Sequence, residues 1–581
     1  MFTAKKFDSR GVPNESSASS GTFNEEAKKS SNLRGVEGWE DTDTDTFGNA
    51  AELGHATSEV HRQLRDYKEF GNLDDLYLDV VSPPLQSCND DEIRMILGIG
   101  SQNPELIDAE QKGTYVLPMR SFELLRSHGN KRSRLERKIC YTVCQTQSIY
   151  TPGSMMSTEN IIELAAEYFV HPMSKTKEIS VLSHPYPSSI TLGHSEDDLK
   201  AVQLVQNLLL SAEKLDKKKY EQARKLLEEC DRMSSSTGTP IQRLVFYFAE
   251  ALYEKIDREK GTVSTKGLGK QNLDPLEDLQ PDQRFQISFH GNHPLSQITQ
   301  FSAMQAVIDH VEEATKIHVI DLEIRSGVQS TILMQALAGR QERPVEHLRI
   351  TAVGTKKKAT IEQTGKRLMA FAESLNLKFS FHIVMVADIL ELNENLFELN
   401  ADEAVAVYAA YTLTYMIAQA DRLEHIMRVI KNIRPCVMIV VEIDTNCNSP
   451  TFVWRFVEAL FFYGAFFDSL AECMKNDETN RRHAESTCFR SSIRNVVAAE
   501  GEERRVRHVG LSVWRAFFAH FGLVELELSM SSLYQANLLR QSFPCQSSCT
   551  LGMNGKCLTI GWKGTPLSTL SAWKFQRDID E

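Results

Sequence analysis

The sequence predicts an α/β fold, a doubly wound and mostly parallel sheet of about seven strands, with a helical cap subdomain and a disordered N-terminal region before it. Three observations support this fold class. From residue 301 onward, short apolar segments alternate with helical patterns, which is typical of βαβ units. Residues 197–256 carry three amphipathic helical stripes joined by short links. The first fifty residues contain few aliphatic side chains.

The region 1–190 is expected to be largely disordered, because its polar runs bury too little apolar surface to offset the entropy of ordering. Two segments interrupt it. Residues 70–81 mix acids with Leu and Tyr, which suits either an activation-type or docking peptide or a short amphipathic helix of the fold. Residues 131–138 form the densest basic cluster, either a nuclear-import signal or a solvated helix face.

Residues 197–300 are predicted to form the mainly helical cap. Its first helix begins near Asp197, with Ser195 and Asp197 as candidate capping residues. Two further apolar stripes follow at residues 220–230 and 244–256. The polar, glycine-bearing stretch from 257 to about 294 is interpreted as a loop or insertion.

Residues 301–575 are predicted to form the α/β core. Strands are expected at 317–322, 347–353, 379–386, 404–410, 436–443, 523–528 and 557–562. Helices are expected between them, among them 361–375, 413–433 and 514–521. This alternation implies right-handed crossovers and a Rossmann-like architecture.

Net charge, apolar runs and cysteine spacing argue against several classes of protein. The 581 residues include 65 Lys and Arg against 78 Asp and Glu, and the net charge of −13 argues against a protein that holds DNA mainly through phosphates. No apolar run reaches the ~18 residues of a membrane span, and the N-terminus has no apolar signal core. The eleven scattered cysteines suit reduced thiols, and their spacing indicates no zinc site. We therefore expect neither membrane insertion, secretion nor a bound metal.

Short motifs follow one another along the folded part in a fixed order. Their residues are Gln242 and Arg243, then His318, Ile320 and Asp321, then Arg349 and Ile350, then Glu442 and Phe456, and finally Trp562, Ser571, Ala572 and Trp573. In this order they resemble the first leucine-rich block, the VHIID block, the PFYRE region and the SAW ending of the plant GRAS family. Residues 367–372 stand where the second leucine-rich block belongs. The resemblance covers about residues 197–575.

The GRAS resemblance implies a nuclear transcriptional co-regulator in plant signalling or development. Such a protein acts as a scaffold that joins DNA-binding transcription factors, zinc-finger types among them, to other GRAS proteins, as a homo- or heterodimer. It implies no catalytic residue, cofactor, metal or membrane contact. Two departures stand out: Ser330 follows Gln329 where the family usually has Trp, and no DELLA or TVHYNP segment is recognisable. The second departure argues against gibberellin-triggered regulation.

The alternative function is that of an S-adenosylmethionine-dependent small-molecule methyltransferase, because GRAS domains resemble these enzymes in architecture. Such an enzyme needs a glycine-rich turn after the first strand and an acid after the second. Here the turn 321–327 contains a single glycine, and 356–358 are all Lys. The candidates for a degenerate cofactor pocket are Asp321, Glu323, Gly327 and Asp388. We interpret Asp321 instead as a helix cap or a partner of loop amides, and we expect the cleft to be filled.

Direct DNA recognition is expected less than recruitment through a DNA-bound partner. The basic stretches 356–358, 481–483 and 504–508 suit either phosphate contacts or solvated loops. No zinc-finger, basic-zipper or homeodomain signature supplies an element that reads a groove. Trp562 and Trp573 are expected to be buried, with their indole N–H groups hydrogen-bonded.

Overall fold

The computed structural model describes residues 156–170, 195–261 and 283–576. The predictions for residues 1–155, including the segments 70–81 and 131–138, lie outside these ranges. Among the helices within them, none combines the length and apolar character needed to span a bilayer.

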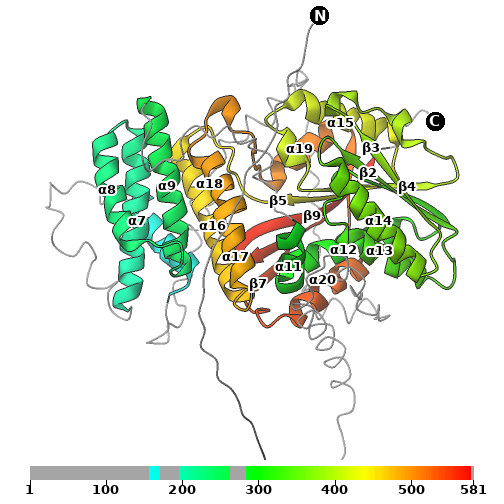
Figure 1. The fold of residues 1–581 in the computed structure, drawn as a ribbon, viewed down its shortest axis with the longest axis horizontal. Coiled ribbons are helices and arrows are strands. Elements are labelled where there is room, and N and C mark those ends of the chain that lie inside the picture. Colours follow the sequence, from blue (N-terminus) through cyan, green and yellow to red (C-terminus); the bar gives the residue numbers. More distant parts are fainter. Residues whose placement is uncertain (1–155, 171–194, 262–282, 577–581) are drawn as a thin grey trace, which may run out of the picture. The chain divides into compact units, whose positions relative to one another are not determined.

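The cap is built from helices that lie side by side (Figure 1). They are α5 (Thr158–Val170), α7 (Glu196–Asp216), α8 (Tyr220–Met233) and α9 (Pro240–Lys260). The predicted start of α7 is confirmed, because the Ser195 side chain accepts from the Asp198 amide and Asp198 caps Ser195 in return. Helix α9 has the same device at Thr239, followed by Pro240 at the first helical position.

Within the described ranges, the sheet has nine strands. In chain order they are β1 (Lys316–Asp321), β2 (His347–Gly354), β3 (Phe379–Met385), β4 (Ala404–Ala410), β5 (Val437–Ile443), β6 (Leu523–Leu526), β7 (Cys549–Asn554), β8 (Cys557–Trp562) and β9 (Thr565–Phe575). Their order in the sheet is β3-β2-β1-β4-β5-β9-β8-β7, and β6 pairs with β9. The first five are parallel, and the pairings of β6 to β9 are antiparallel. The doubly wound prediction is therefore confirmed.

Helices cover both faces of this sheet, which explains why the strands are apolar on both sides. In β4, Ala406 and Tyr408 belong to one core cluster, whereas Val405, Val407 and Ala409 belong to another. The first cluster includes residues of α12 (Pro294–His310), α13 (Val328–Ala338), α14 (Lys358–Ser374), α16 (Phe452–Cys473) and α20 (Met530–Ser542). The second includes residues of α15 (Ala420–Ile433) and α19 (Leu511–His520).

Two helices and two strands of the described residues differ from the sequence prediction. Helix α5 lies inside the region 1–190 that was expected to be largely disordered, and its Ile161, Ile162 and Ala165 are buried. Helix α11 (Gln283–Asn292) lies inside the stretch interpreted as a loop or insertion. The strands β7 and β9 raise the count above the expected seven, because β9 buries Ser and Thr side chains that hide an apolar pattern.

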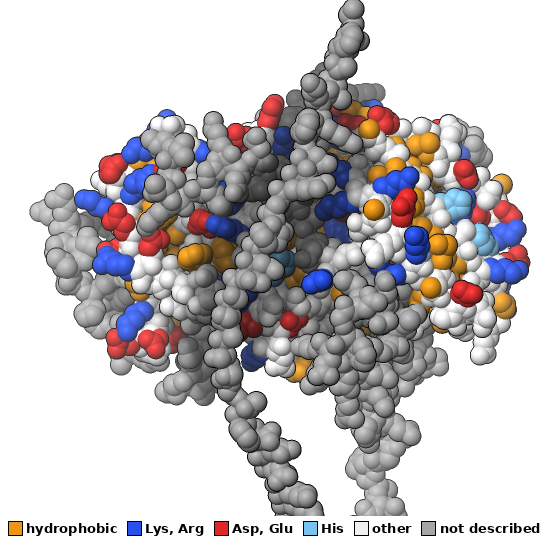
Figure 2. All heavy atoms as spheres, viewed as in Figure 1, with side chains coloured by type: hydrophobic (Ala, Val, Ile, Leu, Met, Phe, Trp, Pro, Cys, Tyr) orange, Lys and Arg blue, Asp and Glu red, His pale blue; other side chains and the backbone are white. Residues whose placement is uncertain are grey.

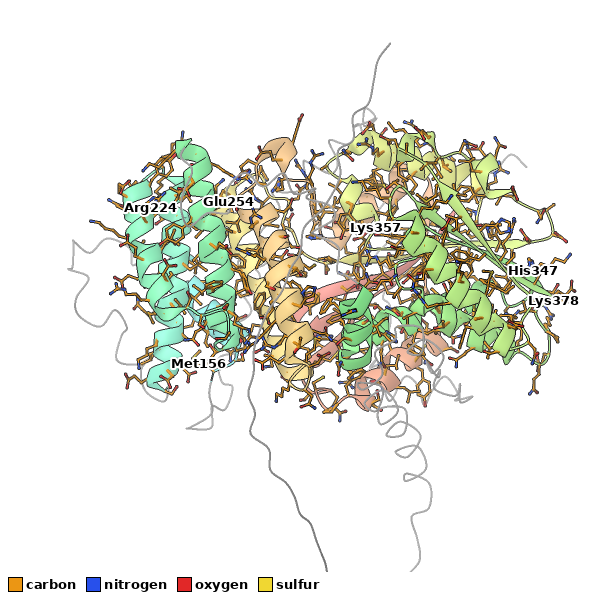
Figure 3. The ribbon with its side chains drawn as sticks, in the orientation of Figure 1. Met156, Arg224, Glu254, His347, Lys357 and Lys378 are labelled. Atoms are coloured by element: carbon orange, nitrogen blue, oxygen red, sulfur yellow. The ribbon has the colours of Figure 1, made fainter. Side chains whose placement is uncertain are left out.

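The two edges of the parallel strands are marked in Figure 3. His347 opens β2 and Lys378 precedes β3, so both lie at the amino edge, whereas Lys357 follows β2 at the carboxyl edge. The carboxyl ends of β1 and β4 meet where the strand order reverses, which is the position at which doubly wound folds bind ligands.

Candidate functional site

A cavity of about 210 Å³ lies at the carboxyl ends of β1, β4 and β5. Its walls come from the loop after β1, from η6 (Leu413–Met416), from α11, α12 and α16, and from the turns around α18 (Arg490–Val497). Much of the lining is aromatic: Phe285, Phe289, Phe462, Phe466 and Phe489. No residue of β2 or β3 is among the described residues that line it. The cavity therefore lies beside β1, β4 and β5 and away from the edge where a nucleotide ribose would bind.

The turn between β1 and α13 is closed by its own side chains. The Asp321 carboxylate accepts the Glu323 amide at 2.9 Å and the Gln329 side-chain amide at 2.9 Å. Gln329 also donates to the Ile324 carbonyl at 3.0 Å, and Ile324 is buried in the core. These bonds occupy groups that a cofactor phosphate or carboxylate would otherwise need.

Asp321 and Gly327 stabilise the conformation of this turn. Burial raises the pKa of Asp321 to about 6, although the hydrogen bonds from Gln329 and the Glu323 amide oppose that rise. Gly327 has φ +78°, and a Cβ there would lie 2.8 Å from Thr364 Cγ2. Neither residue lines the cavity.

Arg325 projects from the same turn into the cavity wall, with its backbone in the left-handed region at φ 51°. Its Nη2 lies 3.3 Å from Glu323 Oε2, and its guanidinium carbon lies 5.5 Å from the Tyr411 ring centroid. Burial disfavours the charged guanidinium, but the Glu323 carboxylate together with Tyr415 and Tyr411 outweighs that effect, so the pKa of Arg325 is raised. Of the four candidate pocket residues, Glu323 alone lines the cavity.

Glu442 lies at the end of β5 and is 2% exposed. Its Oε1 accepts the Thr414 amide at 3.2 Å, while its Oε2 has no hydrogen-bond partner within the described ranges. Burial raises its pKa to about 8, with the Thr414 amide and Arg325 acting in the opposite direction. Glu442 therefore carries a proton at neutral pH.

Asp388 lies apart from the cavity, at the N-cap of η4 (Ile389–Glu391). Its carboxylate pairs with both Nε and Nη2 of Arg422, and Nε lies at 2.8 Å. The hydrogen bonds from Arg422 and from the Leu390 amide lower the pKa of Asp388 to about 2. Its contacts are those of a cap and an ion pair.

Comparison with known protein families shows to which family the chain belongs. Residues 204–574, well over half of the chain, match the model of the GRAS domain family. The chain belongs to the GRAS family. The resemblance drawn from the motif order is thereby confirmed.

The GRAS relatives include proteins from several plants. Over 377 residues the chain is 29% identical to DELLA protein GAI1 of Vitis vinifera, a match that covers 64% of this chain and 62% of that protein. Over 378 residues it is 32% identical to Protein SCARECROW of Arabidopsis thaliana, covering 65% and 56% of the two chains. The chain thus spans less than two thirds of the length of each of these two relatives. The solved structure of SCL7 from Oryza sativa aligns at 27% identity and a TM-score of 0.56, covering 64% of this chain and 99% of that one.

Several GRAS motif residues form a buried network toward the amino end of the sheet. Arg349 on β2 donates to His318 Nδ1 at 3.1 Å and pairs with Glu403, and His318 Nε2 bonds Thr351 Oγ1 at 2.8 Å. Burial and the nearby Arg349 lower the pKa of His318 to about 3, so the imidazole is neutral. Their neighbours Ile320 and Ile350 are core residues.

Other motif residues join the cap to the core. Gln242 completes the Thr239 cap, and Arg243 donates to the buried Glu485 at 3.0 Å. Glu485 begins the π-helical turn η7 (Glu485–Phe489). On α16, Phe456 packs against Phe248 of α9 with ring centroids 5.3 Å apart.

The SAW residues hold the last strand in place. Trp562 and Trp573 are 1% and 2% exposed, and their indole N–H groups donate to Asp468 at 2.7 Å and to Ser571 at 2.8 Å. Ala572 is buried between these contacts. The expectation for both tryptophans is confirmed.

Two of the three basic stretches each contain a buried arginine, whereas Arg482, His483 and Arg505 in them are exposed. Arg481 is buried against Glu485 at 2.9 Å, and Arg504 is buried beside Asn448. Residues 356–358 are exposed. On the face shown in Figure 2, the basic and acidic side chains of the described residues are interspersed.

Sequence reasoning singled out the turn 321–327, which carries Arg325, but missed most of the cavity wall. Tyr408, Tyr411 and Tyr415 line it at the end of β4 and after it. Their close spacing after an apolar strand was the available signal. The contribution of α11 was hidden because that segment was interpreted as a loop.

Proposed function

We propose that this chain is a nuclear co-regulator of transcription in plants, a scaffold without catalytic activity. It joins DNA-binding transcription factors, zinc-finger types among them, to other GRAS proteins as a homo- or heterodimer. Membership of the GRAS family and the likeness to DELLA and SCARECROW proteins support this role. No cofactor or metal takes part, and DNA is reached through partners.

The observation that carries the non-enzymatic part of the proposal is the closed turn after β1. Within the turn, the Gln329 side-chain amide donates to the Asp321 carboxylate and to the Ile324 carbonyl. Arg325 places a cation beside the turn, and this cation would repel the sulfonium group of the cofactor. After β2 the chain continues into exposed lysines, where a cofactor ribose needs an acid. The cavity is the feature that favours the methyltransferase alternative, but the turn beside it lacks the groups that cofactor requires.

The burial of two arginines in the basic stretches supports indirect contact with DNA, through partners. The burial of Arg481 and Arg504 against protein groups removes them from phosphate binding. The motif residues described above form hydrogen bonds and packing contacts inside the fold. Partners would therefore bind to other, exposed residues.

Affinity purification of the tagged full chain from plant nuclei, followed by mass spectrometry, tests the proposal. We expect DNA-binding factors and GRAS proteins to be recovered, and a gel shift with the purified chain alone to show no sequence-selective retention. Recovery of metabolic enzymes without such factors would contradict the scaffold role. Tight, selective retention of DNA by the chain alone would contradict indirect recruitment.

A further inference from the structure

The cavity at the carboxyl edge is large enough for a ligand. Cavities of ~150 Å³ with apolar walls already hold benzene, and this one measures about 210 Å³. Its Phe side chains come from α11, α16 and η7, so elements far apart in the sequence meet around one space. The size and the lining suit a molecule of one or two rings.

The wall also presents hydrogen-bond donors without acceptors. All hydrogen bonds that the Arg325 side chain makes to described residues use Nη2, so its Nε and Nη1 donate to none of them. The hydroxyl groups of Tyr408 and Tyr415 likewise have no hydrogen-bond partner within the described ranges. Tyr408 is 3% exposed. The Arg325 side chain is 20% exposed, so these donors are open to the cavity rather than sealed in the core. An occupant that displaces water from them must offer acceptors in its place, so one that brings acceptor oxygens is favoured.

Two acceptor side chains beside Arg325 are already engaged. Glu323 pairs with Arg325 and accepts from Thr412 Oγ1 at 3.5 Å, and Tyr411 shares a hydrogen bond with Ser568 at 3.1 Å. Gln300 Oε1, also in the wall, has no hydrogen-bond partner within the described residues. Around Arg325 the unmet groups are donors, so the demand there is for acceptor groups. A carboxylate meets it best, because an arginine donates to a carboxylate through two parallel N–H groups.

We propose that this cavity binds a small organic acid, a carboxylate on an apolar skeleton of one or two rings, with Arg325, Tyr408 and Tyr415 as donors to its oxygens. The rings lie among Phe285, Phe289 and Phe466. Because the walls come from α11 and α16 as well as the sheet, the ligand links these helices to the carboxyl edge. This site goes beyond the scaffold role and does not depend on it.

Titration calorimetry of the full chain with 2-naphthoate tests the proposal, with 2-naphthamide as the uncharged analogue of the same shape. We expect saturable binding of the acid below about 1 mM, and binding of the amide at least about tenfold weaker, the loss expected for one charge-assisted hydrogen bond. Arg325→Met should weaken binding of the acid by about tenfold or more. Arg428→Met, on the exposed face of α15, is the matched control and should leave binding unchanged.

Tyr408→Phe gives a second readout that keeps the test decisive if Arg325→Met fails to fold, which a melting curve of each variant will reveal. It removes one hydroxyl group and leaves the ring, so binding should weaken several-fold while the melting temperature changes little. Absence of binding by the unmodified chain would overturn the proposal. Equal affinity for acid and amide, or affinity unchanged in every folded cavity variant, would also overturn it.

Discussion

At the scale of single residues, the acids of the carboxyl edge owe their properties to their surroundings. Asp388 faces Arg422 and is held ionised, whereas Glu442 is buried with one oxygen unpartnered and is held protonated. The sequence identifies both as acids near strand ends, but it does not reveal burial or the nearest cation. These differences give Glu442 a measurable effect on stability.

Replacement of Glu442 by Gln should remove one contribution to the pH dependence of the free energy of unfolding. Burial raises the pKa of Glu442 to about 8, while in the unfolded chain it is about 4.3. The stability from this proton is fully present below about pH 4 and is lost as the pH rises through about 8, by about 1.4 kcal/mol per unit between the two values. Buried neutral imidazoles such as that of His318 gain stability over the same pH range, so the test is the difference between the two chains. From about pH 5.5 to about pH 7.5, urea unfolding should show the free energy of unfolding of Glu442→Gln rising by about 2–3 kcal/mol relative to that of the unmodified chain.

The exposed Glu502→Gln variant is the control for that measurement and should keep the pH dependence of the unmodified chain. If the free energy of unfolding changes by the same amount between the two pH values in Glu442→Gln and in the unmodified chain, then Glu442 is ionised in the folded state and its assignment as protonated is wrong.

At the scale of elements, the parallel strands were predictable and the antiparallel ones only in part. Strands β1 to β5 are apolar runs between helices, because both of their faces are covered. Strand β9 was missed because Ser568, Thr569 and Ser571 are buried in it, where they bond carbonyl groups of β5. Such hydrogen bonds depend on a partner strand that sequence periodicity does not show.

Strand β9 also depends on one large side chain. Trp573 packs against Phe518 of α19 with ring centroids 4.7 Å apart and is 2% exposed. Trp573→Ala should therefore lower the free energy of unfolding by about 3–5 kcal/mol through lost burial and a new cavity. Lys574→Ala, at the exposed neighbouring position, should change it by less than about 0.5 kcal/mol. Chemical denaturation measures both, and a Trp573→Ala transition that coincides with that of the unmodified chain would show that Trp573 is not needed for the fold.

At the scale of the whole molecule, the motif order sufficed to identify the family, since the family match over 204–574 agrees with it. The candidate site was predictable only in outline. The sequence showed that the turn after β1 lacks glycines, but the cavity beside it needs α11, α16 and η7 to come together, and no local pattern encodes that meeting. The expected filling of the cleft therefore applies to the turn after β1, which its own side chains close. Beside the ends of β4 and β5, the cavity remains open.

The central claim is that this fold no longer serves S-adenosylmethionine, and calorimetric titration of the full chain with that cofactor tests it most directly. A methyltransferase of known activity, titrated under the same conditions, is the positive control. The closed turn, the Arg325 cation and the lysines after β2 predict no heat of binding at high micromolar cofactor. Saturable heat that disappears when Gly327 is replaced by a bulkier residue in a variant that still folds would contradict the claim.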